Sequence, residues 1–344
     1  MSIGVDEEYG QLFAAEETPG KQRKKAINSP YIHRIQRRHF MLYNILPIVG
    51  TALAIGLLFY LPITWVEGGI FFLMWLATGI GVTAGYHRLF AHRCYKTTSG
   101  VRVMLAILGS MSGMGSVLSW AAMHRRHHER ADRPGDMHSP NLHGNTFWQR
   151  VRGFWYSHVS WMWKHEYPNV SHYAEDLLKD KALVKASCLY HYWVLLGLAI
   201  PTVLGGLLSQ SWEGALLGFL WGGPVRMFVV ANSMWTLNSV LHTFGWRPFP
   251  MKENSRNSFI LGVFVWGEGW HNNHHAFPNS ASFSLRWYRP DIGFWFISLL
   301  RLLGLAHDVR VPTRERIKKR MQTQPQSTFE LQPKSSGLQV EATN

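Results

Sequence analysis

Long uncharged apolar segments alternate with polar, histidine-rich segments along this chain of 344 residues. Two apolar runs, 40–61 and 69–86, stand close together near the beginning, and two more, 192–208 and 214–237, form a second pair. A bilayer core of ~30 Å is crossed by a helix of ~20 predominantly apolar residues. The pattern therefore predicts four membrane-spanning helices arranged as two hairpins.

Three further features of the apolar pattern need an interpretation. The stretch 101–123 is rich in Gly and Ser, and a span there would put its histidine-rich end on the opposite side from a later histidine motif, so a buried or interfacial helix is expected. The stretch 293–305 has apolar residues at helical spacing and predicts an amphipathic helix on the membrane surface. Arg226 interrupts the fourth run, and snorkelling toward the interface would let it anchor the helix.

The distribution of Lys and Arg orients the predicted spans. The short connections 62–68 and 209–213 contain neither residue, whereas the N-terminal segment, the region between the pairs and the C-terminal segment are strongly basic. Basic residues collect on the cytoplasmic side of membrane proteins. Both termini and the long middle segment are thus expected in the cytoplasm. The expected fold is an all-α integral membrane protein in which a cytosolic helical cap covers one end of the spans.

Composition sets the domain boundaries and limits the partners. Residues 1–39 and 309–344 are too polar to build a core and are expected to be disordered tails around one membrane domain, 40–308. The formal net charge is +14, but the chain has no zinc-finger, basic-zipper or RNP pattern, so nucleic acid is not an expected partner. Membrane lipids and acidic proteins remain as expected partners of this basic chain.

The motifs that carry chemistry are built from histidine. HRLFAH begins at His87, HRRHH at His124 and HNNHH at His271, and His242 follows the fourth apolar run. In H-x-x-H-H the side chains at i, i+3 and i+4 lie on one side of a helix. Two such motifs beside a third pair indicate a metal site, and nine imidazoles are too many for one ion. Two redox-active ions at the membrane surface would suit the activation of dioxygen.

The order and wording of these motifs resemble the membrane fatty acyl desaturases of the stearoyl-CoA desaturase type, over roughly residues 40–305. The resemblance implies a di-iron enzyme that uses O2 and external electrons to insert a cis double bond, typically at Δ9, into a saturated acyl chain. It also implies the metal-ligating and catalytic histidines, and an asparagine that reaches the second iron through water. These residues are His87, His92, His124, His127, His128, His242, His271, His274 and His275, with Asn238 as the asparagine.

The substrate's carrier is left open between CoA and a glycerolipid. Where acyl-CoA enzymes of animal type read WARDH, this chain reads WAAMH from Trp120 to His124, which favours the cyanobacterial acyl-lipid type. Trp120, Trp155 and Trp270 stand beside the motifs and are candidate walls of an acyl tunnel. Within the motifs, Arg125 and Arg126 are expected to point toward a phosphate or a redox partner, and the two asparagines of HNNHH to hydrogen-bond locally.

The electrons must come from another protein, because the chain has no dinucleotide-binding glycine motif, no haem-attachment motif and no iron–sulfur cysteine set. An acidic ferredoxin or a cytochrome b5-like protein is expected to dock on the basic cytoplasmic face. Two other readings remain. One is a histidine-motif membrane hydroxylase or oxygenase, and the other is a metal transporter or sensor without catalytic activity.

Overall fold

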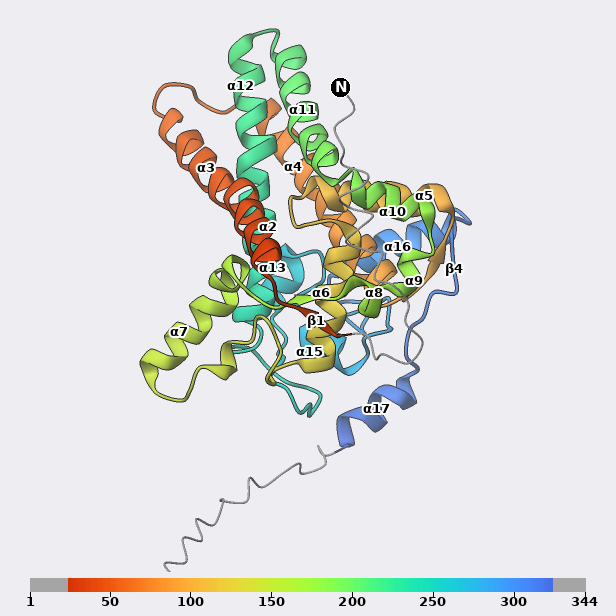
Figure 1. The fold of residues 1–344 in the computed structure, drawn as a ribbon. Helices are drawn as coiled ribbons and strands as arrows, with labels where there is room; N and C mark the ends of the chain where they lie inside the picture. Colours follow the sequence, from red (N-terminus) through yellow and green to blue (C-terminus); the bar gives the residue numbers. More distant parts are fainter. Residues whose placement is uncertain (1–23, 324–344) are drawn as a thin grey trace, which may run out of the picture.

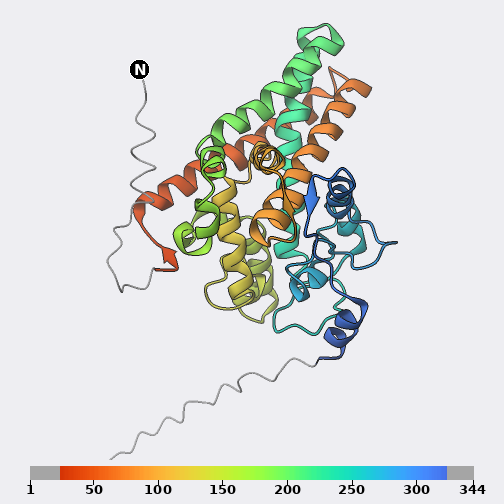
Figure 2. The same ribbon diagram turned by 90° about the vertical axis from the view of Figure 1, so that its right-hand side faces the viewer.

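The computed structural model describes residues 24–323, which are mostly helical (Figure 1). Four helices are long and apolar enough to cross a membrane: Pro30–Leu57, Trp65–Ala91, Tyr190–Ser209 and Trp212–Ser239. They extend together from one side of a body of shorter helices (Figures 1 and 2). The prediction of four spanning helices is confirmed at the level of length and composition.

Three of the four long helices contain a π-helical segment. The first comprises α2 (Pro30–Phe40), η1 (Met41–Ile45) and α3 (Leu46–Leu57). The second joins α4 (Trp65–Ile80) to η2 (Gly81–Ala91), and the third is α11 (Tyr190–Ser209). The fourth comprises α12 (Trp212–Leu220), η5 (Trp221–Val225) and α13 (Arg226–Ser239). Such i→i+5 segments are rare in α-helices and often occur at functional sites.

Caps and glycines explain the ends and the packing of these helices. Thr64 and Glu67 form a reciprocal capping box that starts α4. Ser211 accepts a hydrogen bond from the backbone N–H of Gly214 and starts α12. A Cβ at Gly205 would lie 2.2 Å from the carbonyl oxygen of Gly214, so only glycine lets α11 pack this closely on α12.

The shorter elements fill the region between the second and third long helices and the C-terminal region. The first set is β2 (Lys96–Thr97), α5 (Ser99–Met111), α6 (Val117–Arg130), η3 (Pro140–Leu142), α7 (Phe147–His158), η4 (Ser160–Trp163), β3 (Tyr167–Pro168), α8 (Val170–Tyr173), α9 (Glu175–Leu178) and α10 (Lys181–Cys188). The second set is α14 (Phe259–Phe264), α15 (His271–Ala276), α16 (Ile292–Leu302), β4 (Ala306–His307) and α17 (Arg314–Gln322). β1 (Ala26–Ile27) pairs with β3, and β2 with β4, both antiparallel.

Several boundaries differ from the sequence-based expectation. The first helix begins at Pro30, before the apolar run that starts at residue 40, because the Ser29 side chain accepts a hydrogen bond from the backbone N–H of Ile32. The helix α17 lies inside the predicted C-terminal tail. The stretch 101–123 spans parts of two helices, α5 and α6, separated by a turn, as expected for a segment that does not cross the membrane. The remaining parts of the predicted tails, 1–23 and 324–344, lie outside the described residues.

Arg226 does not snorkel, and its expected role as an interfacial anchor is wrong. Its side chain is fully buried and donates three hydrogen bonds to backbone carbonyls, those of Met111, Gly197 and Gly222. Gly197 stands four residues before Pro201, which has no N–H to offer it. Arg226 therefore replaces backbone donors that the helices lack.

The largest cluster of buried apolar side chains lies where η2, α5, α6 and α16 meet. It includes Tyr86, Leu105, Ala121, Trp266 and Ile297, all at most 1 % exposed. This core holds the ends of the long helices against α6, whose C-terminal half carries the first H-x-x-H-H motif. The histidine-bearing elements η2 and α6 are thereby attached to this apolar core.

Candidate metal centre

Five histidines from three elements form a first group. His87 lies on η2, His92 directly follows it, His124 and His128 lie on α6, and His274 lies on α15. Their ligand nitrogens all lie within 4.8 Å of one another. The Nε2 atom of His274 is 3.0 Å from that of His87 and 2.8 Å from that of His128. The group can provide five imidazole ligands to one ion.

Four histidines form a second group beside the first. They are His127 of α6, His242 just beyond α13, and His271 and His275 of α15, and all four are buried. The Nε2 atom of His271 lies 3.1 Å from that of His242 and 3.2 Å from that of His275. Asn238, four residues before His242, lines the adjoining cavity. The nine histidines singled out from the sequence are thus brought together, in two sets.

The division between the groups explains why H-x-x-H-H occurs twice. In each motif the residues at i and i+4 belong to one group and the residue at i+3 belongs to the other. His124 and His128 face the first group while His127 faces the second; His271 and His275 face the second while His274 faces the first. Since i+3 and i+4 lie on opposite sides of i around a helix, one short helix can supply two adjacent ions.

The π-helical segment η2 brings the two histidines of HRLFAH together. On an α-helix, residues five apart differ by ~140° around the axis. Here the backbone N–H of His92 donates to the carbonyl of His87, an i→i+5 bond that stacks the two residues one turn apart. Their ring centroids lie 5.1 Å apart. The five-residue spacing of this motif places both histidines on the same side only in a π-helix.

Buried carboxylates orient several of these imidazoles from outside. The Nδ1 atom of His87 lies 2.6 Å from Glu268, that of His242 3.0 Å from Asp132, and that of His127 3.1 Å from Asp136. A carboxylate that accepts from Nδ1–H leaves the Nε2 lone pair facing inward and raises its basicity. Sequence analysis missed Asp132 and Glu268 in this role, because lone acidic residues carry no spacing signal.

Burial favours the neutral, metal-ligating form of several of these imidazoles. Desolvation, reinforced by the neighbouring imidazoles, lowers the pKa of His124, His128 and His274 well below the ordinary histidine value. Burial would raise the pKa of Asp136, but His127 outweighs it and the carboxyl stays ionised. Neutral imidazoles are the form that ligates metals.

The donor set fits a pair of metal ions. Nε2 atoms of different histidines face one another at 2.7–3.2 Å, while several Nδ1 atoms are taken by carboxylates. The buried Nε2 atom of His127 has no hydrogen-bond partner among residues 24–323. Buried nitrogens converging in this way are costly unless a cation satisfies them. Imidazole suits Fe, Cu, Zn and Ni, so the donors alone do not select the metal.

The residues between the histidines are structural. Arg125 donates to the carbonyls of Phe90 and Ala91 at the end of η2 and pairs with Asp176, and Arg126 pairs with Glu166. The expectation that these arginines face a phosphate or a redox partner is therefore wrong.

The two asparagines of HNNHH hydrogen-bond locally, as expected. Asn272 donates to the carbonyl of Phe249 and accepts from its N–H, and Asn273 donates to the carbonyl of Phe283. These bonds hold the short helix α15 in a fixed orientation.

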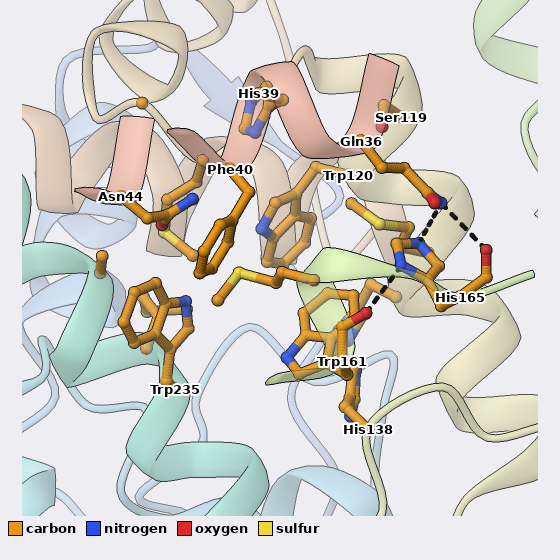
Figure 3. Close-up of a pocket in the computed structure, with 18 of the residues that line it drawn as sticks. Gln36, His39, Phe40, Asn44, Ser119, Trp120, His138, Trp161, His165 and Trp235 are labelled. Atoms are coloured by element: carbon orange, nitrogen blue, oxygen red, sulfur yellow. Dashed lines mark hydrogen bonds between the residues drawn. The ribbon is translucent and has the colours of Figure 1, made fainter. Parts of the chain in front are cut away.

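A cavity of about 560 Å³ adjoins both histidine groups. Its lining includes His87, His124, His127 and His271, and its walls are mainly apolar and aromatic, including Phe40, Trp120, Trp161 and Trp235 (Figure 3). Trp120 stacks on His124 with ring centroids 5.0 Å apart. The size and the apolar lining suit a small-molecule site.

Polar side chains of the first long helix also face this cavity. The side chain of Asn44 is buried and lines the cavity. Gln36 donates to the carbonyl of His165 (Figure 3). His39, His138, His165 and His191 also line the cavity.

Two of the three tryptophans proposed as tunnel walls lie elsewhere. Trp155 is 60 % exposed on α7, and Trp270 is buried against Gly262 with its indole N–H donating to the carbonyl of Pro290. Neither lines the cavity. Proximity to a motif in sequence did not predict proximity to the cavity, because α7 turns outward and Trp270 points away from α15.

The chain thus combines four apolar helices of spanning length with two buried histidine groups that could each hold a metal ion, beside an apolar cavity. The family model for fatty acid desaturases matches residues 63–292, which include all nine histidines. The chain belongs to the fatty acid desaturase family, and its activity class is that of an oxidoreductase.

Curated relatives support the same family. The chain is 49 % identical over 298 residues to the hex-5-enoyl-acyl-carrier-protein acetylenase of Moorena producens, covering 86 % of this chain and 93 % of the relative. It is 32 % identical to the sn-1 stearoyl-lipid 9-desaturase of Anabaena variabilis, covering 76 % and 92 %. It is 33 % identical to Delta-9 acyl-lipid desaturase 2 of Arabidopsis thaliana, covering 73 % and 76 %.

Proposed function

We infer that the protein is an O2-dependent desaturase that uses two histidine-bound iron ions to remove hydrogen from an acyl chain. The observation that carries this is the meeting of both histidine groups with one apolar cavity, through His87, His124, His127 and His271. The first group would hold one iron. The second group, with water held by Asn238, would hold the other.

A methylene pair offers no acidic proton and no electrophilic atom, so acid–base or nucleophilic side chains could not attack it. Bound iron would supply the oxidising power of O2, and the balance is one –CH2–CH2– unit, O2, two electrons and two protons giving –CH=CH– and two water molecules. The protein's own residues position the acyl chain and keep water away from it. Trp120 and Trp235 confine the chain beside the histidines, and the apolar walls exclude water.

The position of the new bond and the acyl carrier follow from the relatives only as proposals. Two desaturase relatives act on acyl lipids at position 9 by name, which favours a Δ9 bond in a glycerolipid-bound chain over a CoA ester. The 49 % identity to an acetylenase named for a carrier-protein substrate favours a second candidate, the conversion of an alkene to an alkyne on acyl-carrier protein. Both reactions remove two hydrogens from adjacent carbons.

The orientation in the membrane remains the one that the basic residues predict. The four spans would form two hairpins, with both termini and the histidine-bearing helices on the cytoplasmic side. There the iron ions would be accessible to a soluble electron donor.

The test is expression in a host that lacks its own desaturase, followed by mass spectrometry of intact lipids, acyl-CoA and acyl-carrier protein. A cis alkene in one pool identifies the reaction and the carrier, and an alkyne from a supplied enoyl chain identifies the second candidate. A hydroxylated product without an alkene would contradict both and indicate a hydroxylase. Purified protein that binds iron but consumes no O2 with donor and substrate would indicate a metal transporter or sensor.

A further inference from the structure

The C-terminal helix α17 concentrates positive charge on the surface. Its nine residues hold a single acidic side chain, Glu315. Its basic residues are all exposed: Arg314, Arg316, Lys318, Lys319 and Arg320. Among residues 24–323 none of them forms an ion pair with a carboxylate. The helix thus carries a block of unneutralised charge, which attracts an acidic macromolecule over a Debye length of ~10 Å.

This helix is fixed to the outside of the second histidine group. Ile317, its one half-buried apolar residue, packs against the buried cluster of Phe249, Ala276 and Phe277. The rings of Phe249 and Phe277 meet edge to face with centroids 5.4 Å apart. Phe277 is two residues beyond His275, and its N–H donates to the carbonyls of Asn273 and His274. Between a partner bound on α17 and a histidine of the second group would therefore lie only the helix itself and the apolar cluster beneath it.

A second contact joins α17 to the same group. Arg320 lies 3.5 Å from the sulfur of Met251, in the loop that also holds Glu253. The carboxylate of Glu253 lies 3.7 Å from Nδ1 of His275. Lys252, exposed in this loop, extends the basic surface. Both connections from α17 lead to the second group.

The position of α17 excludes a lipid surface as its natural occupant. It lies at the opposite end of the molecule from the α11–α12 connection and beyond the body of shorter helices (Figures 1 and 2). If the long helices span a bilayer, α17 stands away from it in the aqueous phase. A soluble acidic protein can reach this surface.

We propose that α17, with Lys252, is the docking surface for a small acidic electron-carrier protein, which would pass electrons by way of the Phe249–Phe277 contact to the iron that the second histidine group would hold. This rests on the proposed desaturase function. The carrier loses one electron per encounter. Two encounters supply the two electrons that, with two protons, complete the reduction of O2 to water as two hydrogen atoms leave the acyl chain.

Charge reversal on α17 tests the proposal. The variant Arg316→Glu/Lys319→Glu changes two exposed side chains on the helix and leaves Ile317 and Arg320 in place. The probes are an oxidised plant-type ferredoxin and the soluble domain of cytochrome b5, each titrated against the purified full-length protein at low salt without turnover. We expect the better-binding probe to bind ~10-fold more weakly, with a reduced salt dependence. The neutral variant Arg316→Gln/Lys319→Gln should bind the probe with an affinity between those of the wild type and the charge-reversal variant.

The matched control is Arg150→Glu/Arg152→Glu, which makes the same change of charge on the exposed helix α7, on the opposite flank in Figure 1. It should bind the probe like the wild type. The KM for the reduced probe should rise in the α17 variant while kcat at saturating probe is kept. Equal weakening in both variants, unchanged binding in the α17 variant, or loss of binding to anionic vesicles instead of the probe would each overturn the docking surface.

The two proposals can fail separately. Binding of the oxidised probe is measured without catalysis. If the wild-type protein formed no unsaturated product, this result would contradict the proposed function and leave the binding result intact. A wild-type protein that desaturates its substrate but whose donor KM is indifferent to the charge of α17 would remove only the docking surface.

Discussion

Replacement of Arg226 by Met should destabilise the protein through two backbone carbonyls. The carbonyl of Gly197 has no helical partner because residue 201 is proline. The carbonyl of Met111 is at the end of α5, and the N–H that would serve it, that of Gly115, is hydrogen-bonded to Tyr190. Each buried acceptor left without a donor costs about 1–3 kcal/mol, which gives ~2–6 kcal/mol for the pair.

The loss of a buried guanidinium offsets part of this cost, since burying a charge is itself unfavourable. The net decrease in the free energy of unfolding is expected to be about 2–4 kcal/mol. At ~2–4 °C per kcal/mol, the apparent Tm of the detergent-solubilised protein should fall by roughly 4–16 °C. Arg226→Lys keeps the charge but cannot reach carbonyls on separate helices, so it should also be destabilised.

A double-mutant cycle with Pro201→Ala isolates the carbonyl of Gly197. Alanine at position 201 restores the missing backbone N–H, so Arg226→Met should cost ~1–3 kcal/mol less in that background. Thermal unfolding followed by tryptophan fluorescence provides the measurement. Additive effects in the cycle, or an Arg226→Met protein as stable as the wild type, would refute the role assigned to Arg226.

Three further predictions concern the metal centre and its support. Because His127 and His274 belong to different groups, replacing either with Ala should remove about one of two bound irons by elemental analysis and abolish product, with membrane insertion unchanged; full iron content would contradict the assignment. Glu268→Gln should lower iron affinity ~10–100-fold, because it weakens the acceptor that orients His87, whereas an unchanged iron titration would count against this. Asp176, whose carboxyl is half-buried, has its pKa lowered by Arg125 against the opposing effect of burial, so it stabilises the fold above the ordinary pKa of ~3.9. Asp176→Asn should therefore lower the Tm of metal-free protein at pH 7, and the difference should vanish as the pH falls through the depressed pKa; an equal difference at low pH would exclude the ion pair.

The repeated histidine motif shows where sequence and structure contribute differently. The spacing of HRRHH and HNNHH was sufficient to predict that each motif places its histidines together, because i, i+3 and i+4 relations are properties of any helix. It could not predict that His127 and His274 cross to the other group, since this depends on how α6 and α15 are rotated against each other. The carboxylates Asp132 and Glu268 were likewise hidden, because each reaches its histidine over a long sequence separation.

By itself the sequence determined the four apolar helices, the identity of the nine histidines and the family, because uncharged length, local spacing and motif order are readable along the chain. Only the tertiary structure decided which histidines belong to the same group, that η2 is π-helical, and that Trp120 lines the cavity while Trp155 and Trp270 do not. The tertiary structure also showed that Arg226, expected to anchor its helix at the interface, instead donates hydrogen bonds to backbone carbonyls. The physical reason is that local periodicity fixes a helix and its faces, whereas the direction that a face points depends on packing between segments far apart in the chain.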